Sequence, residues 1–244
     1  MSARLADPGT GRPRAVSFDA AGTLIHTARP VGELYARVAA RHGVDVDPTD
    51  LHARFRVAFG DAPPLAFPGA PPGELRAREK EWWRAVVRRV FDGLAFRDFD
   101  AFFDDLFAFF ASPAAWRVDP DARTLLVELR GRGLGILVVS NFDARVRGLL
   151  AALELAPLVD QVTISSEAGA AKPDPAIFAR ALADAGLAAS DVVHVGDTIT
   201  EDLRGARAAG IPVLLVGDAA LAREAGDAPV VARLGDVASR LGAR

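Results

Sequence analysis

The chain of 244 residues is long enough for one large domain or two smaller ones, and its 50% hydrophobic and 25% charged residues are typical of an ordinary soluble protein. The net charge of −3 gives no reason to expect nucleic acid or an anionic membrane as a partner. The absence of cysteine excludes disulfides, thiolate metal sites and a cysteine nucleophile.

The N-terminal residues are polar and include glycine and proline, and we expect residues 1–13 to form a flexible tail. This segment lacks the apolar stretch of a signal peptide. No run of about 18 apolar residues, the length that spans a membrane, occurs in the sequence. We therefore expect a cytoplasmic protein that does not enter a membrane.

The first predicted element is a short buried strand, AVSF, which ends at Phe18. Asp19 follows it directly in the stretch DAAGT, where Gly22 permits a sharp turn and Thr23 can hydrogen-bond within that turn. An aspartate in this place either caps the turn or carries chemistry. The strand alone does not decide between these two roles.

A helical block follows, and it contains most of the aromatic residues. Fifteen of the eighteen Phe, Trp and Tyr residues lie between Tyr35 and Trp116. In the stretch DFDAFFDDLFAFF, apolar residues recur at steps of three and four, which is the pattern of an amphipathic helix. We expect a bundle of four or five helices, interrupted by a proline-rich stretch. The predicted helices cover residues 31–42, 49–59, 81–91 and 98–110, and the proline-rich stretch covers residues 61–73.

Beyond residue 116, short apolar runs alternate with helical patterns. Buried strands that alternate with helices predict an α/β fold with a doubly wound parallel sheet. The sheet domain would consist of residues 14–25 and 117–244, with residues 26–116 inserted as a helical domain. Ligands of such sheets collect at the carboxyl ends of the strands. The runs end at Val139, Ile164, Val195 and Val216, and the helical patterns cover residues 120–130, 143–153, 175–185 and 200–209.

Polar groups follow two of these predicted strands. Ser140 and Asn141 can hold anionic oxygens, or they can form the N-cap of the next helix. Lys172 is one of only two lysines among 29 basic residues, which suggests that a compact ammonium is needed there. Such a group at a strand end would neutralise a phosphate; otherwise Lys172 is a solvated surface residue.

Three acids, Asp197, Glu201 and Asp202, crowd into six positions after another apolar strand. Buried carboxylates need a cation or hydrogen-bond donors, because like charges repel. Oxygen ligands of this kind suit Mg²⁺. Acids in the first turn of a helix also interact favourably with its dipole, and we assign Glu201 to that role alone.

These four polar stretches resemble, in this order, the motifs of the haloacid dehalogenase (HAD) superfamily over residues 14–218. The helical insertion resembles the first-type cap of that family, so the resemblance implies a Rossmann-like core with a helical cap. SNFD, KPDPAIF and HVGD further resemble the branch of subfamily IA that contains haloacid dehalogenase-like hydrolase domain-containing proteins. The matching residues are Asp19 and Thr23 in the first motif, Ser140 in the second, Lys172 in the third, and Gly196, Asp197 and Asp202 in the fourth.

The resemblance implies that Asp19 attacks phosphorus and becomes an aspartyl phosphate. It implies that Ser140 and Lys172 are catalytic groups that bind the transferring phosphoryl group. We expect Asn141 and Thr23 to help bind the substrate. The implied ligands of a Mg²⁺ ion are Asp19, the backbone carbonyl of Ala21, Asp197 and, in support, Asp202.

The sequence departs from the family pattern at Ala21, where phosphatases of the family carry a second aspartate. That aspartate protonates the leaving alkoxide and then activates water, a contribution of about 10²- to 10⁴-fold in rate. Only its carbonyl touches the metal, so the metal site should persist. His26 is either a substitute acid or a hinge residue without a catalytic role. We expect His194, inside an apolar strand, to serve packing.

The leading hypothesis is a Mg²⁺-dependent hydrolase of a small phosphorylated substrate, weak on alkyl phosphates and effective where the leaving group needs little protonation. The alternative is a weak or inactive regulatory module that binds Mg²⁺ and phosphate. A phosphonoacetaldehyde hydrolase, which carries alanine at this place, would need a cap lysine, for which Lys80 is the only candidate. A dehalogenase would lack the Gly-Asp metal ligand of the fourth motif. The sequence predicts neither the substrate nor the oligomeric state.

Overall fold

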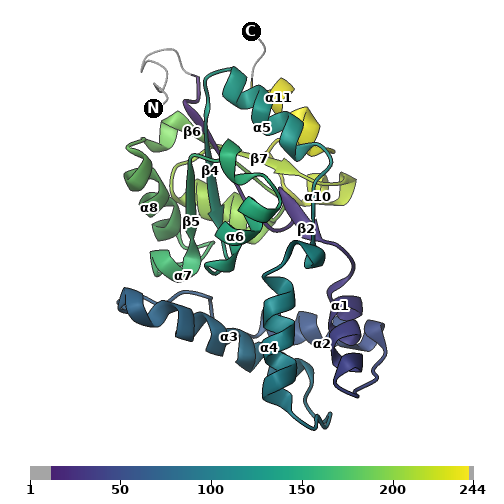
Figure 1. Cartoon of the computed structure of the whole chain (residues 1–244). Coiled ribbons are helices and arrows are strands. Elements are labelled where there is room, and N and C mark those ends of the chain that lie inside the picture. The colour runs from purple at the N-terminus through teal and green to yellow at the C-terminus, as the bar shows by residue number, and fades with distance from the viewer. Residues whose placement is uncertain (1–11, 242–244) are drawn as a thin grey trace.

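The computed structural model describes residues 12–241, so the predicted tail at residues 1–13 lies almost entirely outside the described residues. A six-stranded sheet with the spatial order β5-β4-β1-β6-β7-β8 forms the centre of the fold, and all its strands are parallel (Figure 1). Every predicted strand is present, and β8 is an addition. The bounds are β1 Ala15–Phe18, β4 Gly135–Ser140, β5 Gln161–Ile164, β6 Val192–Gly196, β7 Val213–Val216 and β8 Val230–Val231.

Helices cover both faces of this sheet. Alternate residues of β4 point to opposite faces: Ile136 and Val138 join one apolar core, and Leu137 and Val139 join the other. Helices α5 (Ala122–Gly131), α6 (Arg145–Ala152) and α11 (Val237–Arg240) supply the first core. Helices α8 (Pro175–Ala185) and α9 (Gly205–Ala208) supply the second. The predicted doubly wound α/β sheet is therefore confirmed.

Helix α8 shows how local sequence sets these elements. The Asp174 side chain accepts a hydrogen bond from the Ala176 N–H at 2.9 Å, and Pro175 occupies the first turn, where its missing N–H leaves no hydrogen bond unmade. Ile177 and Phe178 are fully buried against the sheet. Gly186 ends the helix in the left-handed conformation that glycine adopts without strain.

The remaining helices of the sheet domain are short. They are α7 (Ser165–Ala168), α10 (Ala219–Glu224) and 3₁₀ turns at Ala156–Leu158, Ala189–Asp191 and Leu234–Asp236. The helix predicted at residues 200–209 begins with a π-helical turn, Ile199–Arg204, before α9. The Leu203 N–H donates to the carbonyl of Thr198, five residues back, at 3.1 Å. No helix of the described chain has both the length and the apolar character that crossing a membrane requires.

A pair of short antiparallel strands, β2 (Ile25–Thr27) and β3 (Trp116–Val118), leads into and out of the helical insertion. Neither strand was predicted, because three residues are too few for a recognisable pattern. Figure 1 shows the four main helices of the insertion grouped on one side of the sheet domain. They are α1 (Val31–Arg41), α2 (Pro48–Gly60), α3 (Leu75–Val90) and α4 (Phe99–Phe110), with 3₁₀ turns at Pro72–Glu74 and Pro113–Ala115.

The insertion, which we call the cap, has an apolar core of its own. Val86, Val90, Phe102 and Leu106 are at most 2% exposed and pack together there. This core is separate from the two cores that flank the sheet. The uneven distribution of aromatic residues along the sequence follows from this separation, although the limits of residues 26–116 as a domain stay a prediction.

Candidate active site

Asp19 lies at the carboxyl end of β1, in the centre of the sheet, where the chain order of the strands changes direction. Its side chain is buried, and its Oδ1 receives two hydrogen bonds of 2.8 Å, one from the Ser140 hydroxyl and one from the Lys172 ammonium. No hydrogen bond from a described residue reaches Oδ2. Three sequence-distant residues therefore meet at one oxygen, and the second oxygen of Asp19 is left available.

Lys172 is only 3% exposed and carries its charge between two carboxylates. Its Nζ lies 2.8 Å from Asp19 Oδ1 and 2.6 Å from Asp202 Oδ1. Burial alone would lower the pKa of Lys172, but the charges of Asp19 and Asp202 raise it above its usual range. The side chain therefore remains an ammonium. The possibility of a solvated surface lysine does not fit this structure.

Asn141 forms hydrogen bonds with both the N–H and the carbonyl of the Lys172 backbone. Its Nδ2 donates to the Lys172 carbonyl at 2.9 Å, and its Oδ1 accepts from the Lys172 N–H at 2.7 Å. The amide that was expected to bind substrate is thus engaged with the lysine loop. We therefore propose Asn141 as a positioning residue for the ammonium.

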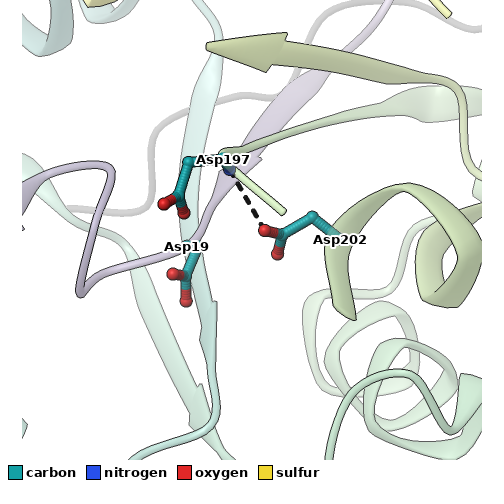
Figure 2. A group of neighbouring side chains, drawn as sticks. All are labelled: Asp19, Asp197 and Asp202. Atoms are coloured by element: carbon teal, nitrogen blue, oxygen red, sulfur yellow. Dashed lines mark hydrogen bonds between the residues drawn. The ribbon is translucent and has the colours of Figure 1, made fainter. Parts of the chain in front are cut away.

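Asp202 is fully buried and uses both of its oxygens within the protein. Oδ1 accepts from Lys172 and from His194 Nε2 at 3.0 Å. Oδ2 accepts from the N–H groups of Asp197 and Thr198 at 3.1 and 3.0 Å and from the Thr198 hydroxyl at 2.7 Å. Burial acts to raise the pKa of Asp202, but the charge of Lys172 and the hydrogen bond from His194 lower it below its usual range. Figure 2 shows Asp202 reaching the backbone of Asp197, so we propose that it supports the site rather than binding a ligand itself.

His194 has a larger role than the packing predicted for it. Its Nδ1 lies 2.9 Å from the Ser17 hydroxyl on β1, and its Nε2 contacts Asp202. It is fully buried and also packs edge-on against the Phe178 ring. A histidine two residues before the Gly-Asp pair in an apolar strand was the available signal. Histidine therefore links β1 and β6 through polar contacts.

Asp197 stands next to Asp19 at the end of β6 and depends on a glycine beside it. Its Oδ1 accepts from the Thr23 hydroxyl at 3.3 Å, so Thr23 contacts this carboxylate. Gly22 has a φ of +106°, and a Cβ there would lie 2.5 Å from Asp197 Oδ2. Burial and the charges of Asp19 and Asp202 raise the pKa of Asp197 to about 7. A carboxylate held in this way is stabilised by a nearby cation.

Oxygen atoms of Asp19, Asp197 and Asp202 lie within 4.8 Å of one another, which is close enough to hold a metal ion. Because the oxygens of Asp202 already have donors, Asp19 and Asp197 are the more available carboxylates. No hydrogen bond from a described residue reaches the carbonyl of Ala21, so this oxygen is also available. The donor set consists of oxygens, which fits a hard divalent cation.

A chamber of about 600 Å³ opens beside this site, between the cap and the sheet domain. Its floor includes Ala21, Gly22 and Asn141, which border the carboxylates. Most of the other lining side chains are apolar, and many are aromatic. They include Tyr35, Phe55, Phe59, Trp83, Val87, Phe103, Leu106, Phe107, Phe110, Trp116 and Phe142.

Several hydrogen bonds between α3 and the sheet domain dock the cap beside this chamber, and two of them are short. Trp83 Nε1 donates to Asp143 Oδ2 at 2.6 Å, and the Ser166 hydroxyl donates to Glu79 Oε1 at 2.6 Å. Glu79 is only 2% exposed and Asp143 is fully buried. The sequence did not single out these residues, because their partners are distant in the chain.

His26 and Lys80 differ in their relation to the site. His26 lines the chamber with Ala21, and its Nε2 lies 3.2 Å from Asp119 Oδ2. Lys80 is 41% exposed at its side chain and pairs with Asp104 at 2.9 Å on the cap surface. The lining of the chamber contains no lysine among residues 12–241, so the structure gives no support to a Schiff base at Lys80.

Known proteins resemble this chain in sequence. The haloacid dehalogenase-like hydrolase family matches residues 13–210. Haloacid dehalogenase-like hydrolase domain-containing protein 3 of Homo sapiens is 37% identical over 214 residues, which cover 85% of this chain and 84% of the human protein. A phosphoserine phosphatase of Thermus thermophilus is 37% identical over 131 residues, covering 53% of this chain and 52% of that protein.

Solved structures resemble it in fold. The HAD hydrolase YfnB of Bacillus subtilis, solved with bound magnesium, has a TM-score of 0.73 at 16% identity, covering 94% of this chain and 99% of that chain. A HAD phosphatase from Thermococcus onnurineus has a TM-score of 0.63 at 21% identity, covering 93% and 97%. At these identities the likeness concerns the fold alone. Sequence and fold agree with the motifs quoted above, and the chain belongs to the haloacid dehalogenase-like hydrolase family.

Proposed function

We propose that this hydrolase removes the phosphoryl group from a small phosphorylated substrate, with Asp19 as the nucleophile and Mg²⁺ as the cofactor. The observation that carries the proposal is the meeting of Ser140, Lys172 and Asp19 at one oxygen, beside the carboxylate of Asp197. Phosphoryl transfer depends mainly on positioning and on neutralising charge, and this arrangement supplies both.

In the first step, a carboxylate oxygen of Asp19 forms a bond to phosphorus, and the bond from phosphorus to the leaving oxygen breaks. The electron pair of that bond stays on the leaving oxygen. In the second step, water attacks phosphorus, which restores the Asp19 carboxylate and releases phosphate. One proton of the water reaches the leaving oxygen through solvent. The Lys172 ammonium and the Ser140 hydroxyl hold the phosphoryl oxygens during both steps.

Asp19, Asp197 and the Ala21 carbonyl would hold the Mg²⁺ ion, with Asp202 fixing the turn that carries Asp197. A bound Mg²⁺ offsets the negative charge of the phosphate and lowers its repulsion from the Asp19 carboxylate. The name of one relative supports phosphatase chemistry, since the similar protein of Thermus thermophilus is a phosphoserine phosphatase. The choice of Mg²⁺ rests on the oxygen donors of this site, which fit a hard divalent cation.

Ala21 makes the nature of the leaving group important. No carboxylate stands there to protonate a leaving alkoxide, so substrates whose leaving oxygen is stable as an anion are favoured. Acyl and aryl phosphates meet this requirement. Acetyl phosphate with Mg²⁺ should therefore be hydrolysed, and removal of the metal by EDTA should stop the reaction. Binding of Mg²⁺ and phosphate without turnover of acyl or aryl phosphates would instead favour the regulatory module.

Gly22 offers a test of the metal site in which none of the proposed ligand residues is substituted. Gly22→Ala should weaken Mg²⁺ binding by roughly tenfold or more, because the new Cβ would push against the Asp197 carboxylate. Calorimetric titration with Mg²⁺ measures this effect. Gly43→Ala is the matched control, since Gly43 also has a positive φ, +78°, but has no atom within 4 Å of the added Cβ. Equal Mg²⁺ affinities in the two variants would contradict the assignment.

A further inference from the structure

The chamber beside Asp19 has the character of a binding site for an aromatic ring. Its volume of about 600 Å³ exceeds what a phosphate needs, and the extra space lies on the cap side among apolar side chains. The Tyr35 ring centroid lies 5.5 Å from those of Phe55 and Phe110, in edge-to-face geometry. Aromatic rings bind well in such surroundings, whereas the many hydroxyls of a sugar would lose their hydrogen bonds to water.

One polar group in this apolar wall lacks a partner. Tyr35 is the only tyrosine of the chain and is 3% exposed, yet its hydroxyl makes no hydrogen bond with any residue between 12 and 241. Among the described residues the fully buried side-chain atoms without a partner are Arg14 Nε and His52 Nδ1, so the Tyr35 hydroxyl is instead open to the chamber, where it can donate to a ligand in place of water. Burial raises the pKa of Tyr35 above its usual range, so the hydroxyl keeps its proton and acts as a donor.

Three arginines, Arg29, Arg117 and Arg145, line the chamber, and the charge of Arg145 is already neutralised by Asp143. Arg145 donates from Nε and Nη2 to the two oxygens of Asp143 at 2.9 and 2.7 Å, and from Nη1 to the Phe107 carbonyl at 3.2 Å. Its Cζ lies 3.8 Å from the Phe107 ring centroid and 5.3 Å from that of Trp83. The Arg145 guanidinium thus forms part of the wall and is not available to pair with a second negative charge on the substrate.

We propose that this chamber binds the leaving group of an aryl phosphate, with the aromatic ring among the cap side chains and a carbonyl or similar acceptor on that ring facing Tyr35. The proposal rests on the phosphatase function proposed above and specifies its substrate class. Ala21 lies in the floor of the same chamber, where the leaving oxygen departs. A phenolate leaves without a proton donor far more readily than an alkoxide, so the apolar chamber and the missing acid select the same substrates.

Binding tests the proposal without any need for turnover. Phenylphosphonate, which cannot be hydrolysed, should bind in the presence of Mg²⁺ roughly tenfold tighter than ethylphosphonate, because its ring buries more apolar surface than an ethyl group does. An acetyl group in the para position should tighten binding further in the native protein, and Tyr35→Phe should remove that gain. Calorimetry measures all of these affinities. Equal affinity for the phenyl and ethyl compounds would overturn the proposal.

A steric block locates the binding site. Val31 lines the chamber, so Val31→Trp should remove the preference for phenylphosphonate over ethylphosphonate. Val57→Trp is the matched control, because Val57 is 62% exposed and lies outside the chamber, and the preference should survive in it. A preference that persists in Val31→Trp would place the ring elsewhere and overturn the proposal.

Turnover of acetyl phosphate distinguishes a failure of the proposed phosphatase function from a failure of the proposed substrate class. Acetyl phosphate carries no ring, so its hydrolysis depends on the phosphatase chemistry alone. Hydrolysis of acetyl phosphate together with equal affinity for both phosphonates would leave the proposed function intact and remove the substrate class. Tight, ring-dependent binding without hydrolysis of any acyl or aryl phosphate would retain the chamber as a site for aryl phosphates and remove the catalytic function.

Discussion

Lys172→Met is expected to reduce the hydrolysis of acetyl phosphate by roughly 10³-fold or more, because the ammonium neutralises charge at the reacting phosphate and no other cationic side chain among residues 12–241 contacts Asp19. The same change leaves the carboxylates of Asp19 and Asp202 without their shared cation in a site where Lys172 is 3% exposed. The free energy of unfolding should therefore fall by about 3–5 kcal/mol in the absence of metal. Steady-state kinetics and urea denaturation measure the two effects.

Lys80→Met provides the matched control, since Lys80 is the only other lysine in the sequence. Its ion pair with Asp104 is exposed on both sides and is expected to contribute less than about 1 kcal/mol. Activity in this variant should stay close to that of the native protein. A Lys172→Met protein that turns over substrate as well as Lys80→Met would show that Lys172 has only a structural role.

Ala21→Asp is expected to produce the largest gain. Ala21 is exposed and lines the chamber, so a carboxylate has room there. It would supply the missing proton donor and raise kcat/KM for a simple alkyl phosphate by about 10²- to 10⁴-fold. The gain should be smaller for aryl phosphates, because a phenolate needs less protonation. A comparison of ethyl phosphate with phenyl phosphate measures this difference.

Ala21→Asn separates proton transfer from simple occupation of space. The amide has nearly the same size as the carboxylate but cannot donate and accept a proton in the pH range of the reaction. Ethyl phosphate hydrolysis should therefore stay at the native level in Ala21→Asn. Equal gains in the two variants, or no gain in either, would contradict the role given to the missing carboxylate.

Much of the fold could be predicted because the strong patterns are local. The runs ending at Phe18 and Val216 become strands with those ends, and the periodic stretch at 175–185 becomes a helix with the same bounds. The strands at Ile25–Thr27 and Val230–Val231 were not predicted, because two or three residues are too few to show an alternating pattern. The π-helical turn at Ile199–Arg204 escaped because its hydrogen bonds depend on backbone geometry.

For the candidate site, the proximity of the residues could be predicted from the sequence, but their individual contacts could not. Placing each polar residue at the end of a parallel strand was enough to predict that Asp19, Ser140 and Asp197 lie close together, because such ends share one edge of a sheet. Which atoms they contact could not be predicted. The two bonds of Asn141 to the Lys172 backbone depend on how two loops meet, and so do the donors that occupy Asp202.

The chamber is the part of the site that the sequence pattern predicted least well. The aromatic stripe of α4 was interpreted as packing, and Phe102 is indeed fully buried in the cap core. Phe103, Phe107 and Phe110 of the same helix also line the chamber. Periodicity identifies the apolar face of a helix but does not indicate which part of that face meets a neighbour and which part meets a cavity.

Asp19 is proposed to carry the phosphoryl group as a covalent intermediate, and trapping that intermediate is the most direct test. Protein quenched with sodium borohydride during turnover of acetyl phosphate with Mg²⁺ should contain homoserine at position 19, because borohydride reduces an acyl phosphate to an alcohol. Peptide mass spectrometry locates the change, and Asp19→Asn should show neither turnover nor reduction. Continued turnover with an unmodified aspartate at position 19, or with the modification at Asp197, would contradict the account.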